Sequence, residues 1–219
     1  MNTPPEAPDA RQRHDSRIFT TRDALIHALP YLSGKTADLG AGAAKYKPLI
    51  LPHASGYVAF DIAPGPAIDV TGDIERTPFK DDEFDTIIST QVLEHVRRPW
   101  LVVEEMRRIL KPGGIAFITA PFLVQHHGHP DDFFRYTTSG IASLFADRGF
   151  EIIESAGYGR TFGVLSEMLH FSYFDPYGKP LSRVRRKILT IMGDVFRALD
   201  ARSRSRAIYA NVYVIARKR

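Results

Sequence analysis

The feature of this chain that most constrains its fold is the alternation of short strand-like runs with longer helical segments. Apolar, β-rich runs occupy residues 36–40, 57–62, 84–90, 114–122 and 150–156. Helices are expected from about residue 22, where Thr21 can cap the first one, over 99–110 and over 139–148. The last two stop at KPGG (111–114) and Gly149. Strands that alternate with helices at this spacing indicate βαβ units. We therefore predict an α/β fold with a Rossmann-like, doubly wound sheet and helices on both faces.

A further β-rich run, residues 207–216, comes after a long intervening segment and is predicted to be an antiparallel last strand in an otherwise parallel sheet. With 219 residues, the chain can bury one sizeable core. Residues 1–16 are rich in proline and charge and are predicted to form a disordered leader. Residues 17–219 are predicted to form a single domain, with an inserted aromatic and basic cap segment at about 158–206.

Composition excludes several kinds of site. The chain has no cysteine, so disulfides, thiolate nucleophiles and cysteine-type zinc sites are absent. No run reaches the roughly eighteen consecutive apolar residues that a membrane-spanning helix needs. We expect a cytoplasmic protein whose chemistry comes from His, Asp, Glu, Tyr, Lys or a cofactor.

Two turns at the ends of the first predicted strands indicate a ligand. DLGAG (38–42) is expected where a strand gives way to a helix, so that main-chain N–H groups from Gly40 onward can approach an anionic group closely. Asp61 closes the next strand 23 residues after Asp38, where a carboxylate can accept hydrogen bonds from two ribose hydroxyls. Both features suit a nicotinamide dinucleotide or S-adenosylmethionine. Lys45 stands where the dinucleotide fingerprint needs a third small residue, which weakens the dinucleotide interpretation.

With these landmarks in place, the chain resembles the class I S-adenosylmethionine-dependent methyltransferases of the small-molecule type, over about residues 20–157 and the final strand. The D-x-G-x-G turn, the acid at 61, the G-D-hydrophobe turn at 72–74, the D-x-x-F-D run that ends at Asp85 and L-K-P-G-G at 110–114 occur in the family's order. The resemblance implies S-adenosylmethionine as cofactor. It also implies these contact residues: Asp38, Gly40, Ala41, Gly42, Asp61, Ile62, Asp73, Ile74, Ser89, Thr90 and Gln91.

The segment STQVLEHV (89–96) holds a further candidate, His95. Some quinone-precursor O-methyltransferases carry E-x-x-E-H here and are associated with a metal. In this chain Gln91 replaces the first acid, so no metal is expected at this position. His95 is either a catalytic residue or a histidine at a helix start that neighbouring main chain satisfies.

The stretch HHGHPDDFFRY (126–136) is rich in histidine and aspartate, which are common metal ligands. All three histidines belong to one loop with Gly128 and Pro130, so a metal site is not expected there either. Alternatively, Asp131 and Asp132 cap a short helix by accepting N–H bonds. Arg135 is expected to pair with Asp132 at spacing i, i+3.

The same stretch has a counterpart in the methyltransferases that the chain resembles. They carry a related H-x-x-P-x-D-F-x-R-[YF]-T pattern after the corresponding strand. Here the pattern corresponds to His126, Pro130, Asp132, Phe133, Arg135, Tyr136 and Thr137. The resemblance implies a substrate-side loop. A hydroxyl acceptor must lose its proton, and histidine, with a pKa near 6.5, suits that role. We expect His129 to be the base, with His126 or His127 as alternatives.

A basic segment precedes the last strand. The segment from Arg183 to Arg206 contains eight basic residues and two aspartates, which gives it a net charge of +6. The whole chain has a net charge of +4, so the remainder carries −2. From Leu181 onward apolar residues fall on one helical stripe, although Gly193 interrupts it. Three interpretations follow: a cap over the substrate site, an interfacial helix on an anionic membrane or lipid-linked substrate, and a nucleic-acid surface. Nucleic acid is the least favoured because no RNA-binding pattern accompanies the charge.

Taken together, these residues predict methyl transfer from S-adenosylmethionine to a small-molecule, glycan or lipid-precursor acceptor, with oxygen as the expected methylated atom. Two alternatives stay open at this stage. One is a non-catalytic cofactor-binding protein of the same fold, and the other is a nicotinamide-dependent oxidoreductase.

Overall fold

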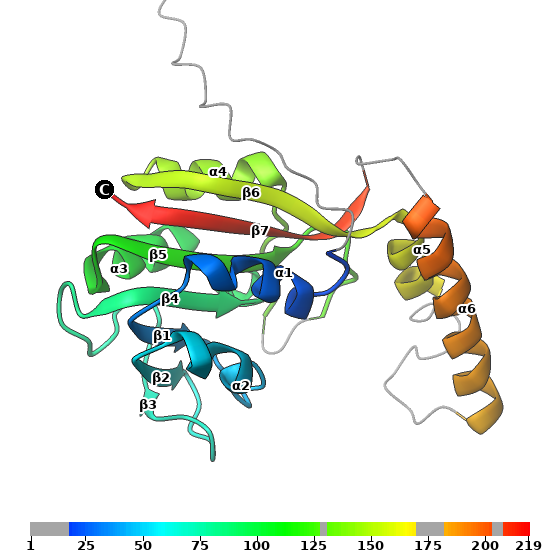
Figure 1. The fold of residues 1–219 in the computed structure, drawn as a ribbon, viewed down its shortest axis with the longest axis horizontal. Coiled ribbons are helices and arrows are strands. Elements are labelled where there is room, and N and C mark those ends of the chain that lie inside the picture. Colours follow the sequence, from blue (N-terminus) through cyan, green and yellow to red (C-terminus); the bar gives the residue numbers. More distant parts are fainter. Residues whose placement is uncertain (1–17, 128–130, 170–181, 203–207) are drawn as a thin grey trace, which may run out of the picture.

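The computed structural model describes residues 18–127, 131–169, 182–202 and 208–219. Within them, seven strands form one sheet in the order β3-β2-β1-β4-β5-β7-β6 (Figure 1). The strands are β1 (Lys35–Leu39), β2 (Gly56–Asp61), β3 (Val70–Thr71), β4 (Phe84–Thr90), β5 (Leu110–Pro121), β6 (Phe150–Arg160) and β7 (Tyr209–Lys218). The predicted leader lies outside the described residues.

The pairing of the strands confirms the predicted sheet. β1 pairs in parallel with both β2 and β4, and β3 and β5 extend the parallel arrangement on either side. β7 runs antiparallel between β5 and β6, as expected of the last strand. Because the chain order reverses between β1 and β4, the carboxyl ends of these two strands flank the switch point where ligands of such sheets bind.

Helices cover both faces of the sheet. The helices are α1 (Thr21–Ala28), α2 (Lys47–Ile50), α3 (Pro99–Ile109), α4 (Thr138–Ala146), α5 (Thr161–Leu169) and α6 (Arg183–Arg202), with 3₁₀ turns η1 (Leu29–Tyr31), η2 (Leu51–His53) and η3 (Leu93–His95). α1 and Ile50 of α2 pack in one buried cluster with Ile88 and Phe117 of the sheet. α3 and α4 pack in the other, against Ile87 and Ile118. Neighbouring residues of β4 thus serve opposite cores, because side chains alternate along a strand.

Several predicted element boundaries differ from the structure. α1 is capped by Thr20 instead of Thr21, since the Thr20 hydroxyl accepts from Asp23 N at 3.1 Å and the Asp23 carboxylate accepts from Thr20 N at 3.0 Å. The KPGG run lies inside β5 as a local irregularity in its pairing with β4. No regular helix begins between 131 and 137, so the capping role predicted for Asp131 and Asp132 is wrong.

α5 and α6 lie apart from the layered body. They follow β6 along the chain and stand beyond the ends of β6 and β7 (Figure 1). They are the described parts of the predicted cap segment, while residues 170–181 and 203–207 lie outside the described residues. None of the described helices combines the length and apolar character needed to cross a membrane.

Candidate active site

The turn after β1 is shaped by two glycines in the left-handed region. Gly40 has φ +77°, and a Cβ added there would lie 2.3 Å from Cγ2 of Val92. Gly42 has φ +55°, yet nothing lies within 4 Å of the place its Cβ would take. Gly40 is therefore required for packing against the loop after β4, whereas Gly42 faces open space at the carboxyl edge of the sheet.

This turn is tied to the end of β2. The N–H groups of Gly40 and Ala41 both donate to the carbonyl oxygen of Phe60, at 2.8 and 3.0 Å. The N–H of Gly42 donates to Oδ2 of Asp61 at 2.8 Å. Beside Asp61, Ile62 is 79 % exposed, an unusual degree for a large apolar side chain. The predicted cofactor residues of β1 and β2 thus form one ledge with an acid and an apolar surface.

A helix does not follow this turn directly. Residues 41–46 form turns, and α2 begins only at Lys47. Ala44, with φ +49°, adopts a left-handed conformation that an α-helix cannot continue through. The anion-binding helix N-terminus expected after DLGAG is therefore replaced by turns.

Two predicted contact residues support the ledge from inside. Asp38 is only 3 % exposed and accepts a hydrogen bond of 2.6 Å from the Tyr57 hydroxyl. Burial raises the pKa of Asp38 to about 6, against the lowering effect of that hydrogen bond. Ser89 is fully buried, and its hydroxyl donates to the carbonyl oxygen of Leu39 at 2.7 Å. Both side chains therefore hold β1 in place.

The remaining predicted residues continue the same edge. Asp73 is exposed in the turn after β3, where Oδ1 accepts from Glu75 N at 2.8 Å, while Ile74 packs partly against the core. Thr90 and Gln91, at the end of β4, are partly exposed. The Gln91 amide donates to Oγ1 of Thr119 at 3.1 Å. All the predicted positions therefore lie along the carboxyl ends of four adjacent strands.

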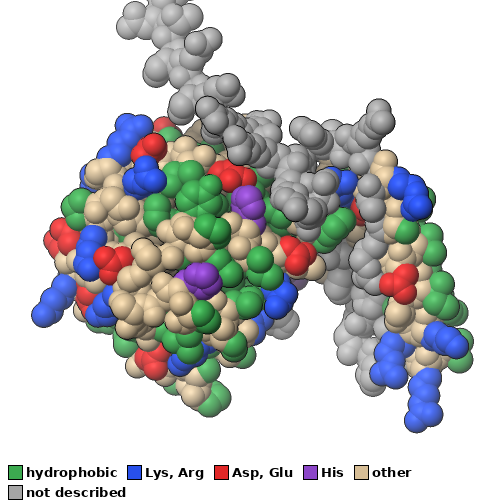
Figure 2. Space-filling model, in the orientation of Figure 1, with side chains coloured by type: hydrophobic (Ala, Val, Ile, Leu, Met, Phe, Trp, Pro, Cys, Tyr) green, Lys and Arg blue, Asp and Glu red, His purple; other side chains and the backbone are tan. Residues whose placement is uncertain are grey.

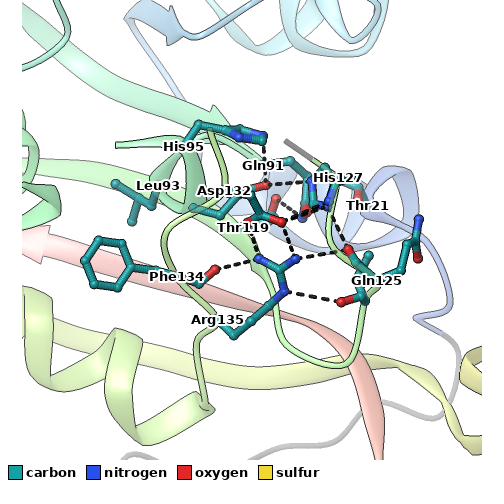
Figure 3. A network of polar contacts seen from close by, with 12 residues as sticks. Thr21, Gln91, Leu93, His95, Thr119, Gln125, His127, Asp132, Phe134 and Arg135 are labelled. Carbon is teal, nitrogen blue, oxygen red and sulfur yellow. Dashed lines mark hydrogen bonds and ion pairs between the residues drawn. The ribbon is translucent and has the colours of Figure 1, made fainter. Parts of the chain in front are cut away.

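The loop after β5 is held by one ion pair. Asp132 and Arg135 pair as predicted, and Nη2 of Arg135 lies 2.5 Å from Oδ2 of Asp132 (Figure 3). Arg135 also donates to the carbonyl oxygens of Val124 and Gln125, at 3.3 and 3.0 Å. Asp132 in turn accepts from the N–H of His127 at 3.0 Å. The hydrogen bonds from Arg135 hold the pKa of Asp132 well below its usual range, so the pair stays charged.

These contacts bring His127 to a second histidine and a buried acid. The Nε2 atoms of His95 and His127 lie 3.7 and 3.8 Å from Oε1 of Glu94. The two imidazole rings meet edge to face, with centroids 5.2 Å apart. Nδ1 of His95 lies 2.5 Å from the carbonyl oxygen of Asp131, and Nδ1 of His127 lies 3.1 Å from that of Gln125. A carbonyl oxygen only accepts, so Nδ1 is the donor in both contacts, and Nε2 is the ring nitrogen directed to Glu94.

Glu94 is the exceptional member of this cluster. It is fully buried, and neither carboxylate oxygen has a hydrogen-bond partner among the described residues. Burial raises the pKa of Glu94 to about 7. A buried acid that titrates near neutrality beside two imidazoles can share or accept a proton. The three groups also offer ligand atoms within 4.8 Å of one another, an arrangement that could hold a divalent cation.

The structure separates the predicted histidines. His126 is exposed, His127 joins the Glu94 cluster, and His129 lies outside the described residues. His95 joins the same cluster from η3. Its Nδ1 contacts the carbonyl oxygen of Asp131, as expected of a histidine that neighbouring main chain satisfies, and its catalytic role stays a prediction. Sequence reasoning missed Glu94 as a functional residue. The signal was the position of the acid, directly before His95 at the carboxyl edge.

Comparison with known proteins finds similarity to methyltransferases. Residues 37–118 match the family described as a methyltransferase domain. A protein of Mycobacterium tuberculosis (strain ATCC 25177 / H37Ra), described as an uncharacterized methyltransferase, is 30 % identical over 49 % of this chain and 52 % of its own length. A similarly described protein of Mycobacterium marinum is 31 % identical over 40 % of each chain. The chain thus spans about half the length of the curated relatives it matches.

Solved structures share the fold at low identity. The (4+2)-cyclase SpnF superposes with a TM-score of 0.59 at 18 % identity, covering 94 % of this chain and 85 % of its own. Phosphoethanolamine N-methyltransferase 2 of Haemonchus contortus, solved with S-adenosyl-L-methionine, gives 0.57 at 13 % identity, covering 90 % of this chain and 52 % of its own. These likenesses support the fold alone, because one fold carries different reactions.

Proposed function

We propose that this chain carries a class I S-adenosylmethionine-dependent methyltransferase domain and that it methylates an oxygen atom of a small-molecule, glycan or lipid-precursor acceptor. The single observation that carries the choice of oxygen is the buried Glu94 with the Nε2 atoms of His95 and His127 beside it. An oxygen acceptor needs a group that takes its proton, and this cluster supplies one at the edge of the sheet.

The residues of the ledge fit the cofactor. The open space at Gly42 leaves room for the amino-acid end, and the carboxylate of Asp61 lies where ribose hydroxyls would donate. The exposed side chain of Ile62 offers an apolar surface for the adenine. When bound, S-adenosylmethionine would supply an electrophilic methyl group on a positively charged sulfur.

The acceptor side then has two tasks. It must hold the acceptor oxygen in line with the methyl group, because alignment alone provides effective molarities on the order of 10⁵ M or more. It must also accept the hydroxyl proton as the new oxygen–carbon bond forms and the sulfur–carbon bond breaks. We assign that proton to Nε2 of His127, and the resulting imidazolium is stabilised by the Glu94 carboxylate 3.8 Å away.

Calorimetric titration with S-adenosylmethionine is the first test of this function. A screen of cell extracts with S-adenosylmethionine tritiated in the methyl group follows, with the products separated into lipid, glycan, RNA and small-molecule fractions. Label in an O-methylated lipid, glycan or small molecule supports the proposal. Binding without label in any fraction favours a non-catalytic protein of the same fold. Binding of NAD(P)H and none of S-adenosylmethionine favours an oxidoreductase.

A second role for the cluster is favoured by the ligand atoms of Glu94, His95 and His127 that converge within 4.8 Å. A divalent cation bound there would orient an acceptor oxygen directly and lower its pKa. The predicted absence of a metal stays a prediction until elemental analysis of the purified protein. Activity that survives chelation supports the proton-transfer role, whereas activity that is lost and then restored by one divalent metal supports the cation.

A further inference from the structure

One face of α6 is fastened to α5. The carboxylate of Asp200 accepts hydrogen bonds from the N–H groups of Phe162 and Gly163, at 3.0 and 2.9 Å, and so caps the start of α5. The carbonyl oxygen of Asp200 accepts from Arg160 at 2.7 Å. The ring of Phe196 stacks on that of Phe162, with centroids 6.0 Å apart. This face is therefore a built contact that sets how α6 is rotated about its axis.

The opposite side of α6 presents an apolar stripe to solvent. It consists of Val184, Ile188, Ile191, Val195 and Leu199, whose exposed fractions range from 40 to 69 %. Their spacing of three or four residues puts them on one side of the helix, and the middle of this stripe lies roughly 100° around the axis from Phe196 and roughly 140° from Asp200. Figure 2 shows these hydrophobic side chains along the outer edge of the helix. A helix that only covered a substrate site would turn such a stripe inward.

Basic side chains flank this stripe. Exposed Arg183, Arg185, Arg186 and Lys187 lie in the first turns of α6, and exposed Arg202 ends it. Figure 2 shows blue side chains near both ends of the helix. Cations at a helix N-terminus oppose the helix dipole, so their gathering there is not explained by helix stability. An apolar stripe bordered by arginine and lysine matches a bilayer surface, where acyl chains meet anionic headgroups.

We propose that α6 docks the protein on anionic membranes, lying in the plane of the interface with the Val184–Leu199 stripe in the acyl boundary. The basic residues at its ends contact anionic phospholipid headgroups. Docking through α6 uses no residue of the layered body, which carries the carboxyl edge of the sheet. The inference stands independently of methyl transfer, since it rests on no residue of the candidate active site.

The test is cosedimentation of the full chain with vesicles of phosphatidylcholine alone and with roughly one third phosphatidylglycerol. We expect binding to the anionic vesicles that weakens several-fold between about 0.1 and about 0.5 M salt. The double variant Ile188→Asp/Val195→Asp should weaken binding about 100-fold, because two side chains lose their apolar burial and gain charge. Arg185→Glu/Lys187→Glu should weaken it about 10-fold or more.

Matched controls lie on the body. Leu51→Asp replaces an apolar side chain that is 46 % exposed in η2, and Arg107→Glu reverses an exposed charge on α3. Both should bind as the wild type does, and circular dichroism checks that every variant is folded. Equal loss in controls and α6 variants, or no binding of the wild type at either salt concentration, would overturn the proposal. A second outcome would also overturn it. If light scattering shows a dimer that Ile188→Asp/Val195→Asp converts to a monomer, and the wild type does not bind vesicles, the stripe is a dimer contact.

Discussion

The two halves of the sheet's carboxyl edge are built on different principles. The half formed by β3, β2 and β1 is made of main-chain turns whose polar groups satisfy one another, as in the bonds from Gly40 N and Ala41 N to the carbonyl oxygen of Phe60. The half formed by the ends of β4 and β5 is made of side chains on loops. There Arg135 and Asp132 hold His127 against Glu94, and the Glu94 carboxylate has no hydrogen bond among the described residues.

On the proposed function, this difference separates binding from chemistry. A main-chain ledge tolerates little change, since its shape depends on backbone conformation. A buried, unsatisfied acid destabilises the fold and titrates in the working range, which is what a proton-transfer site requires. We therefore expect changes to the first half to alter cofactor affinity, and changes to the second to alter the rate at saturating cofactor.

The largest effect is expected from the acceptor half. His127→Gln should lower kcat by about 10²- to 10⁴-fold with cofactor affinity unchanged, because it removes the proton acceptor. Glu94→Gln removes the neighbouring negative charge that favours the imidazolium. It should shift the acidic limb of the kcat profile to lower pH. Near-normal turnover of His127→Gln would refute its role.

The next largest effects are expected from substituting Gly40 and Gly42, the two glycines of the ledge. Gly40→Ala places a Cβ 2.3 Å from the Val92 side chain at a positive φ, so it should cost about 1–3 kcal/mol of stability and weaken S-adenosylmethionine binding. Gly42→Ala meets no protein atom within 4 Å, so it should destabilise less while still weakening binding. Thermal unfolding and calorimetry measure both effects. Equal unfolding temperatures for the two variants would contradict the packing assigned to Gly40.

Asp61 isolates a single interaction of the ledge. Asp61→Ala should weaken S-adenosylmethionine binding about 10- to 100-fold, since charged hydrogen bonds contribute about 1.5–3 kcal/mol, while kcat at saturating cofactor stays near the wild-type value. Asp61→Asn keeps one acceptor oxygen, so its affinity for S-adenosylmethionine should lie between those of the wild type and Asp61→Ala. A large fall in kcat at saturation would show that the two halves are not separable.

Asp38 has the smallest expected effect on activity and a distinct effect on stability. Because its folded pKa of about 6 exceeds the unfolded value, the folded state prefers the protonated form. Its contribution is complete below about pH 4 and is lost as the pH rises through about 6. Relative to Asp38→Asn, the wild type should therefore lose on the order of 2 kcal/mol over that interval. Denaturant unfolding at a series of pH values measures this, and parallel curves would contradict it.

Particular residues mark how far prediction from sequence reached. The strand ends that carry Asp38, Asp61 and Gln91 were predictable because a buried parallel strand needs an unbroken apolar run, and the turn chemistry comes directly after it. The Arg135–Asp132 pair was predictable because its spacing is local. The contact between Glu94 and His127 was not predictable, since the two residues are 33 positions apart in the sequence. Only the folding of the loop after β5 brings them together. His129, the expected base, lies outside the described residues, and its role stays a prediction.

The sequence by itself determined the α/β class, the antiparallel last strand, the resemblance to class I methyltransferases and the order of the cofactor landmarks. It did so because these depend on periodicity, turn residues and local spacing. The tertiary structure decided which predicted residues are exposed at the edge and which, such as Asp38 and Ser89, support it from inside. It also decided that the apolar stripe of α6 faces outward, because rotation of a helix is set by contacts between residues distant in sequence, here Phe162 with Phe196.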